Sequence, residues 1–169
     1  MEEVTLTDML DARERRAFLQ SRLLKEYNLP LICFTLNIPG PVKVLPKVPQ
    51  AYEQGCRLIK RALMEQAFPV VHFEEIKEKT GYEAFFCVDA PATELKRMMV
   101  QLEDQDLLGR LFDIDVIQTN GFKISREETG GSGRRCLLCG RPAQECGRSR
   151  RHTVPELTAR VQSILEERL

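Results

Sequence analysis

Two aspartates separated by one residue give the sharpest local chemical signal in the sequence. Asp113 and Asp115 lie in the apolar segment RLFDIDV. In a β-strand, alternate side chains leave the same face, so the two carboxylates would lie about 6.6–7 Å apart along the backbone. Carboxylates spaced in this way can hold Mg²⁺ while the phosphate oxygens of a nucleotide complete its shell. The motif indicates a catalytic metal site, and a solvated strand edge explains the same spacing equally well.

Arginine is concentrated in residues 134–151. This segment has six arginines and one acid, Glu145, although the formal net charge of the whole chain is zero. Guanidinium groups bind phosphate oxygens bidentately, so the segment predicts a contact with a triphosphate or a pyrophosphate. A solvated basic surface is the alternative. No aromatic residue lies in the segment, so stacking on nucleic-acid bases is not favoured. The six arginines are Arg134, Arg135, Arg141, Arg148, Arg150 and Arg151.

The same segment contains a cysteine and histidine pattern, C-x₂-C-x₆-C-x₅-H. Its members are Cys136, Cys139, Cys146 and His152. Four such ligands can close a tetrahedral Zn²⁺ site, but the second half of the spacing is irregular for zinc ribbons and knuckles. A chain of this length can also form a core without a metal. We therefore expect free thiols packed under a loop, with structural Zn²⁺ as the less favoured alternative.

Helices and strands must position these residues. Hydrophobic periodicity and breaker residues predict strands over 29–39, 68–76, 82–90 and 110–118, and helices over 7–27, 49–66, 92–106 and 154–168. Thr7 is the expected N-cap of the first helix, and Leu10 and Phe18 lie on its expected buried face. The middle of the chain reads β-α-β-β-α-β, the order of ferredoxin-like folds. The predicted fold class is α+β.

The 169 residues suit a single domain. We divide it into an N-terminal helix (7–27), an α/β core (30–124), a mobile loop rich in Gly, Ser, Glu and Thr (125–133), and a Cys/Arg-rich segment with a closing helix (134–169). Three further cysteines, Cys33, Cys56 and Cys87, lie on apolar faces of predicted elements and are expected in the core.

Composition and missing motifs exclude several classes. Lys and Arg total 25, and Asp and Glu total 25, so no global field attracts nucleic acid or an anionic membrane. The first residues lack the features of a secretory signal, and the longest uncharged stretch (27–42) is too short and too proline-rich to cross a bilayer. We expect a cytoplasmic protein without nucleic-acid or membrane partners. G-x-S-x-G, Walker and G-x-G-x-x-G motifs are absent, which disfavours serine hydrolases, P-loop NTPases and dinucleotide oxidoreductases.

Four blocks, in order, resemble the apo-citrate lyase phosphoribosyl-dephospho-CoA transferase family, also called citrate lyase holo-acyl-carrier-protein synthases. They are DARERR (11–16), LNIPGPVK (36–43), GRLFDIDV (109–116) and CLLCGRPAQECGRSRRH (136–152). The resemblance implies transfer of the 2′-(5″-phosphoribosyl)-3′-dephospho-CoA group from triphosphoribosyl-dephospho-CoA to a serine of the citrate lyase acyl-carrier (gamma) subunit, with release of pyrophosphate. The related malonate decarboxylase transferase is similar in its paired aspartates, and this match implies a catalytic role for Asp113 and Asp115.

This chemistry is nucleotidyl transfer, which needs Mg²⁺, carboxylates to hold it, and cations for the departing pyrophosphate. The candidate substrate-binding residues are Lys43, Arg110, Arg148, Arg150 and Arg151. Asp89, at the end of a predicted strand, is the best candidate for a third carboxylate. Two alternatives stay open: a transferase that uses a common nucleoside triphosphate, and a non-catalytic, zinc-stapled, Arg-rich module that binds a protein or RNA.

Overall fold

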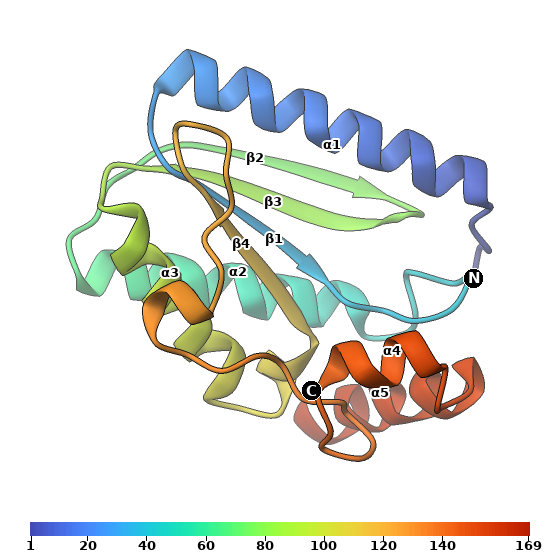
Figure 1. Cartoon of the computed structure of the whole chain (residues 1–169). Helices are drawn as coiled ribbons and strands as arrows, with labels where there is room; N and C mark the ends of the chain where they lie inside the picture. Colours follow the sequence, from blue (N-terminus) through green and yellow to red (C-terminus); the bar gives the residue numbers. More distant parts are fainter.

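A four-stranded antiparallel sheet with helices on both faces forms the centre of the protein (Figure 1). The structure, a computed structural model, describes residues 1–169. The strands are β1 (Leu31–Leu36), β2 (Val70–Glu78), β3 (Gly81–Val88) and β4 (Phe112–Ile117). The helices are α1 (Leu6–Tyr27), α2 (Val48–Glu65), α3 (Ala92–Asp104), α4 (Ala143–Ser149) and α5 (Val154–Arg168). The predicted α+β class and the β-α-β-β-α-β element order are confirmed.

The order of the strands in the sheet is β2-β3-β1-β4. Helix α2 connects β1 to β2, and β3 lies between these two strands, which is the split βαβ arrangement. β4 lies at an edge of the sheet and pairs only with β1. The sheet order was not predicted from the sequence.

Alternate residues of each strand feed two apolar cores on opposite faces of the sheet. Ile32 and Phe34 of β1 belong to the larger core, to which α2, α3 and α5 contribute. Leu31 and Cys33 belong to the smaller core under α1. Helix α2 approaches the sheet so closely at Gly55 that a Cβ there would lie 2.2 Å from the Phe34 ring. The predicted core cysteines Cys33, Cys56 and Cys87 are all buried.

Helix α1 differs from the expectation in its start and in its buried face. The hydroxyl of Thr5, not that of Thr7, accepts a hydrogen bond from the Asp8 N–H, and the Asp8 carboxylate accepts one from the Thr5 N–H. Leu10 and Phe18 are 51% and 72% exposed. The residues that face the sheet are Ala12, Leu19 and Leu23. The prediction failed because α1 carries apolar residues on two faces, and periodicity alone does not say which face meets the sheet.

The segment 125–133, predicted to be a mobile loop, contains a 3₁₀ turn over Glu127–Thr129. The side chain of Arg126 is only 11% exposed, and it pairs with Glu103 and Asp104 of α3. These ion pairs attach the start of the segment to α3, and its mobility stays a prediction. None of the helices combines the length and the apolar character that a membrane-spanning helix requires.

Candidate active site

Strand β4 presents Asp113 and Asp115 on the same face of the sheet. Phe112, Ile114 and Val116 alternate with the two acids and are buried in the larger core. Asp113 lies opposite Thr35 of β1 and Asp115 opposite Cys33, so both acids share the face that α1 covers. The strand and the shared face are therefore as predicted. The metal-binding and catalytic roles of the two acids stay predictions.

The two carboxylates have different surroundings. The Lys123 Nζ lies 3.1 Å from Asp115 Oδ2, whereas Asp113 has no partner among the hydrogen bonds and ion pairs of the chain. Asp113 is open to solvent on one side, but the protein atoms around it desolvate the carboxylate and raise its pKa. The nearby negative charge of Asp115 raises this pKa further, and Arg134 opposes the rise. Asp113 is thus a carboxylate that the protein leaves without a counterpart.

Asp113 lines a cavity of about 470 Å³ that also contains three arginines. These are Arg110, which precedes β4, and Arg134 and Arg135 from the Cys/Arg-rich segment. Asn37, which follows β1, lines it too. The remaining wall comes from Glu127, from parts of the stretches 133–137 and 142–147, and from His152 and Leu157. Two acids, Asp113 and Glu127, and three arginines thus line a space suited to an anionic phosphate group with a bound cation.

Hydrogen bonds fix two of these arginines. Arg134 donates to the carbonyl oxygens of Phe112 and Arg110, at 2.7 Å in both cases. Arg110 Nη2 in turn donates to the carbonyl oxygen of Arg135 at 3.0 Å. The side chain of Arg135 makes no hydrogen bond or ion pair and is exposed. Arg110 and Arg134 therefore connect β4 to the Cys/Arg-rich segment, and Arg135 keeps its guanidinium available for a ligand.

The buried carboxylate of Glu103 on α3 stabilises the position of Arg134 and of strand β4. Its side chain is 3% exposed, lies 3.1 Å from Arg134 Nη1 and 2.7 Å from Arg126 Nη2, and accepts a hydrogen bond from the Ile114 N–H at 2.9 Å. Lys96, about two turns before Glu103 on α3, donates to the Ile114 carbonyl oxygen at 3.1 Å. Both backbone groups of Ile114 on the open edge of the sheet are thereby satisfied. Glu103 is not predictable as a site residue, because nothing in its local sequence pattern marks it as buried.

Several predicted ligands lie outside the cavity. Lys43 Nζ donates to the Ile38 carbonyl oxygen at 2.8 Å, and burial lowers its pKa. Arg148, Arg150 and Arg151 are exposed, and none of them lines the cavity of Asp113. Of the predicted substrate-binding residues, only Arg110 shares the cavity with Asp113. The roles of the other four stay predictions.

Asp89 does not lie near the paired aspartates. The strand register aligns Glu83 of β3 with Thr35 of β1, and Thr35 with Asp113 of β4. Asp89 follows Glu83 by six residues, which places it about 20 Å away along the strand direction. Asp89 therefore does not supply a third carboxylate beside Asp113. The acid level with Asp113 is Glu83, which forms an ion pair with Arg16 of α1.

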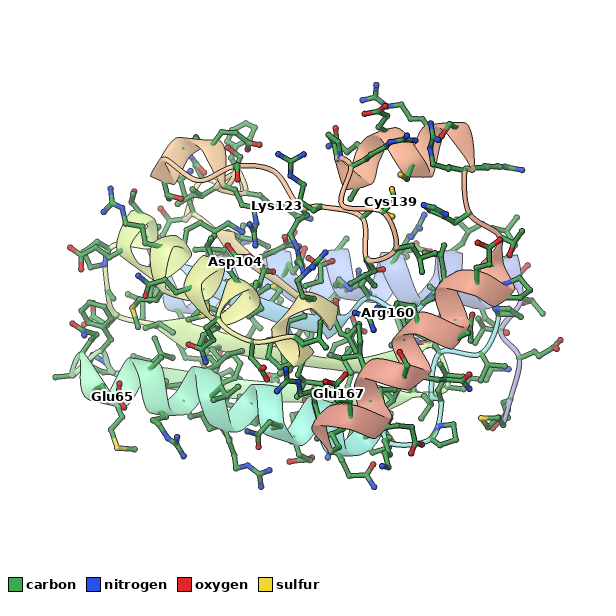
Figure 2. The ribbon with its side chains drawn as sticks, turned by 90° about the horizontal axis from the view of Figure 1, so that it is seen from below. Glu65, Asp104, Lys123, Cys139, Arg160 and Glu167 are labelled. Atoms are coloured by element: carbon green, nitrogen blue, oxygen red, sulfur yellow. The ribbon has the colours of Figure 1, made fainter.

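The four residues of the cysteine and histidine pattern come together beside the cavity. Cys136, Cys146 and His152 line it, and Cys139 lies next to them. In Figure 2, Cys139 lies beside α4, between that helix and α5, whose Arg160 and Glu167 are labelled. The sequence pattern favours free thiols and gives a zinc site of these four residues as the alternative, and the structure brings all four together.

Comparisons with known proteins identify the family. The model of the apo-citrate lyase phosphoribosyl-dephospho-CoA transferase family matches residues 4–168. A protein of Streptococcus pyogenes serotype M5 is 38% identical over 168 residues, which cover 97% of this chain and 86% of the relative. A protein of Vibrio cholerae serotype O1 is 39% identical over 165 residues, covering 97% of this chain and 93% of the relative. Both carry the name "probable apo-citrate lyase phosphoribosyl-dephospho-CoA transferase". This chain, with its Arg-lined cavity beside β4, belongs to the apo-citrate lyase phosphoribosyl-dephospho-CoA transferase family.

Proposed function

We propose that this transferase attaches the 2′-(5″-phosphoribosyl)-3′-dephospho-CoA group to a serine of the acyl-carrier (gamma) subunit of citrate lyase, with triphosphoribosyl-dephospho-CoA as the donor. The family match over nearly the whole chain and the names of its relatives support the transfer to apo-citrate lyase. In the reaction, the serine oxygen forms a bond to the α-phosphorus, and the bond from that phosphorus to pyrophosphate breaks. The serine proton passes to solvent. The enzyme needs no nucleophile of its own.

One observation carries the assignment of this reaction to a place in the protein: Asp113 shares its cavity with three arginines. A triphosphate carries several negative charges, and departure of pyrophosphate moves charge onto the leaving group. Arg135, which is exposed and unpaired, can bind two phosphate oxygens at once. Arg110 and Arg134 add positive charge from positions that hydrogen bonds hold fixed.

Asp113 and Asp115 are the residues that would hold Mg²⁺. Their donors are hard carboxylate oxygens on one face of a strand, and Asp113 has no protein partner to displace, so the donor set fits this ion. Binding at Asp115 would have to compete with the ammonium group of Lys123. When bound, Mg²⁺ supplies charge neutralisation for the phosphate oxygens. The protein's own contribution is to hold Asp113 in the same cavity as the three arginines.

The test is a reconstitution with purified components. The protein is incubated with the apo acyl-carrier subunit, triphosphoribosyl-dephospho-CoA and Mg²⁺, and the intact mass of the carrier is measured. We expect a gain equal to one phosphoribosyl-dephospho-CoA group, and no gain when the acceptor serine is replaced by alanine. A carrier that stays unmodified, or one that is modified equally well with ATP as the donor, would refute the proposed donor and reaction.

A further inference from the structure

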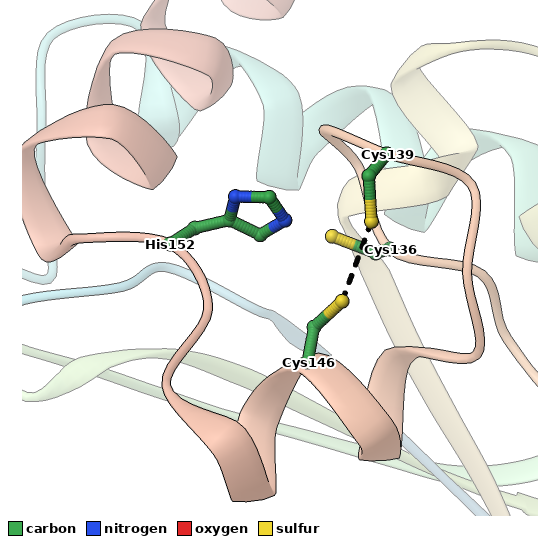
Figure 3. Close-up of side chains that lie close together, drawn as sticks. All are labelled: Cys136, Cys139, Cys146 and His152. Atoms are coloured by element: carbon green, nitrogen blue, oxygen red, sulfur yellow. Dashed lines mark hydrogen bonds between the residues drawn. The ribbon is translucent and has the colours of Figure 1, made fainter.

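Three sulfur atoms and one imidazole converge between the Cys/Arg-rich segment and the start of α5. The ligand atoms of Cys136, Cys139, Cys146 and His152 all lie within 4.8 Å of one another. Figure 3 shows the three sulfur atoms and the His152 ring turned toward a common centre. In a tetrahedral Zn²⁺ site the ligand atoms are about 3.5–3.8 Å apart, given bonds of about 2.0–2.3 Å. The separations in this cluster are therefore close to those of a zinc site.

His152 provides a second, independent observation. Its Nε2 atom is buried and has no hydrogen-bond partner in the protein. A buried polar atom without a partner has lost its hydrogen bonds to water and gained none in return, so folded proteins rarely tolerate one. On the other side of the ring, Nδ1 lies 3.9 Å from the Glu156 carboxylate. A histidine with one nitrogen toward a carboxylate and the other free is the arrangement that metal ligands show.

The backbone around the first two cysteines is shaped to present both sulfurs to one side. The Leu138 N–H donates to Cys136 Sγ at 3.5 Å, which favours negative charge on that sulfur. The Gly140 N–H bonds back to the Cys136 carbonyl oxygen, and Gly140 adopts a φ of 73°, in the left-handed region that glycine favours. Cys146 comes from α4, and His152 follows that helix. Three local structures therefore converge on one point.

We propose that Cys136, Cys139, Cys146 and His152 bind one structural Zn²⁺ ion. Three thiolates and a neutral imidazole are a common tetrahedral ligand set for zinc, and four protein ligands leave no open position for catalysis. Binding releases the three thiol protons to solvent. The proposal reverses the weighting of the sequence analysis, in which irregular spacing favoured free thiols. Spacing measures only the distance along the chain. In the folded protein, α4 places Cys146 next to Cys136 and Cys139.

Zinc at this position would stabilise the wall of the candidate active site. Cys136, Cys146 and His152 line the same cavity as Asp113. Arg135, which directly precedes Cys136, would be held in place by the metal. The proposal concerns the metal content of the protein and does not depend on the proposed reaction.

Elemental analysis of the full chain, purified without a metal-affinity tag or chelator, tests the proposal. We expect about one zinc per chain, and a large loss of zinc in Cys139→Ser, whose side chain is exposed. Cys56→Ala is the matched control, because Cys56 lies on α2 and is buried in the larger apolar core, away from the cysteine and histidine cluster. It should keep its zinc. Wild-type protein without zinc, or Cys139→Ser with full zinc, would overturn the proposal.

Thiol reactivity gives a readout that does not depend on a variant. We expect the cluster thiols of the native protein to resist alkylation until a strong chelator is added, and the chelator also to lower the melting temperature. The Cys139 and Cys146 sulfurs lie 3.4 Å apart, so oxidation to a disulfide is the competing use of this pair. Isolation of the protein with that disulfide and without zinc would refute the metal site.

Discussion

At the residue scale, Asp113 is a partly desolvated carboxylate on the edge strand β4, and the fold supplies no partner for it. Asp115, two residues later, has the ammonium group of Lys123 at 3.1 Å. Desolvation, followed by the charges of Asp115 and Glu103, raises the pKa of Asp113. A perturbed acid in a cavity is typical of a group that binds a ligand, whereas acids that stabilise a fold are normally paired. Asp113 therefore costs stability when it is ionised.

This cost predicts a pH-dependent gain from Asp113→Asn. A raised folded-state pKa means that the folded protein binds the proton more tightly than the unfolded chain does. The stability is then highest below the ordinary carboxyl pKa and falls as the pH rises through the folded value. We expect Asp113→Asn to melt at a higher temperature than wild type at about pH 7, and this difference to vanish near pH 3.

Thermal unfolding followed by circular dichroism across this pH range measures the effect. Asp115→Asn is the control, because it removes an ion pair with Lys123 and should give no such gain. A lower melting temperature for Asp113→Asn at neutral pH would show that the acid is paired in solution.

A second residue-scale prediction concerns Arg135. Because its guanidinium lines the cavity without a protein partner, we expect Arg135→Ala to raise the Michaelis constant for the donor about tenfold, or about 1.4 kcal/mol. Arg135→Lys should recover only part of this loss, since an ammonium group cannot bind two oxygens in a fork. Arg141→Ala is the matched control: it is exposed in the same segment but does not line the cavity. Equal effects of the two alanine variants on steady-state kinetics would contradict the assignment.

At the scale of elements, side chains of α3 bond the backbone groups on the outer edge of β4 that no neighbouring strand pairs with. Lys96 and Glu103 bond the two outward backbone groups of Ile114. Glu103 also pairs with Arg126 and Arg134, which join α3 to the chain that follows β4. The position of the paired aspartates and that of the Cys/Arg-rich segment thus depend on one buried carboxylate.

We therefore expect Glu103→Gln to lower the free energy of unfolding by about 3 kcal/mol, because two arginines lose their buried counter-charge. The amide can still accept the hydrogen bond from Ile114, so the loss reports mainly on charge. Asp104→Asn breaks an ion pair with the same Arg126, but Asp104 is 54% exposed, and we expect a loss of at most about 1 kcal/mol. Urea denaturation of both variants measures the difference. Similar small losses would show that Glu103 is not a structural anchor.

The elements were more predictable from the sequence than the contacts between them. The strand with Asp113 was predictable because apolar and polar residues alternate in FDIDV. The buried face of α1 was not, since apolar side chains occur on two sides of that helix. The cysteine cluster and the choice of Arg110, Arg134 and Arg135 over Arg148, Arg150 and Arg151 depend on how residues 134–152 fold back, which local patterns do not encode.

At the scale of the whole molecule, the candidate site is shared between the sheet and the C-terminal part of the chain. β4 supplies the carboxylates, and the segment before α5 supplies two arginines and the proposed zinc ligands. The resemblance blocks at 109–116 and 136–152 are separated in sequence but meet at one cavity. The two blocks are thus parts of a single site.

The central claim is that group transfer depends on Asp113 in this cavity. Measurement of pyrophosphate release tests this claim most directly. With apo acyl-carrier subunit, triphosphoribosyl-dephospho-CoA and Mg²⁺, we expect wild-type protein to release one pyrophosphate for each carrier modified. Asp113→Asn should slow this release at least about 100-fold, or about 2.7 kcal/mol, while remaining folded. Near-normal release by the folded Asp113→Asn variant would contradict the account.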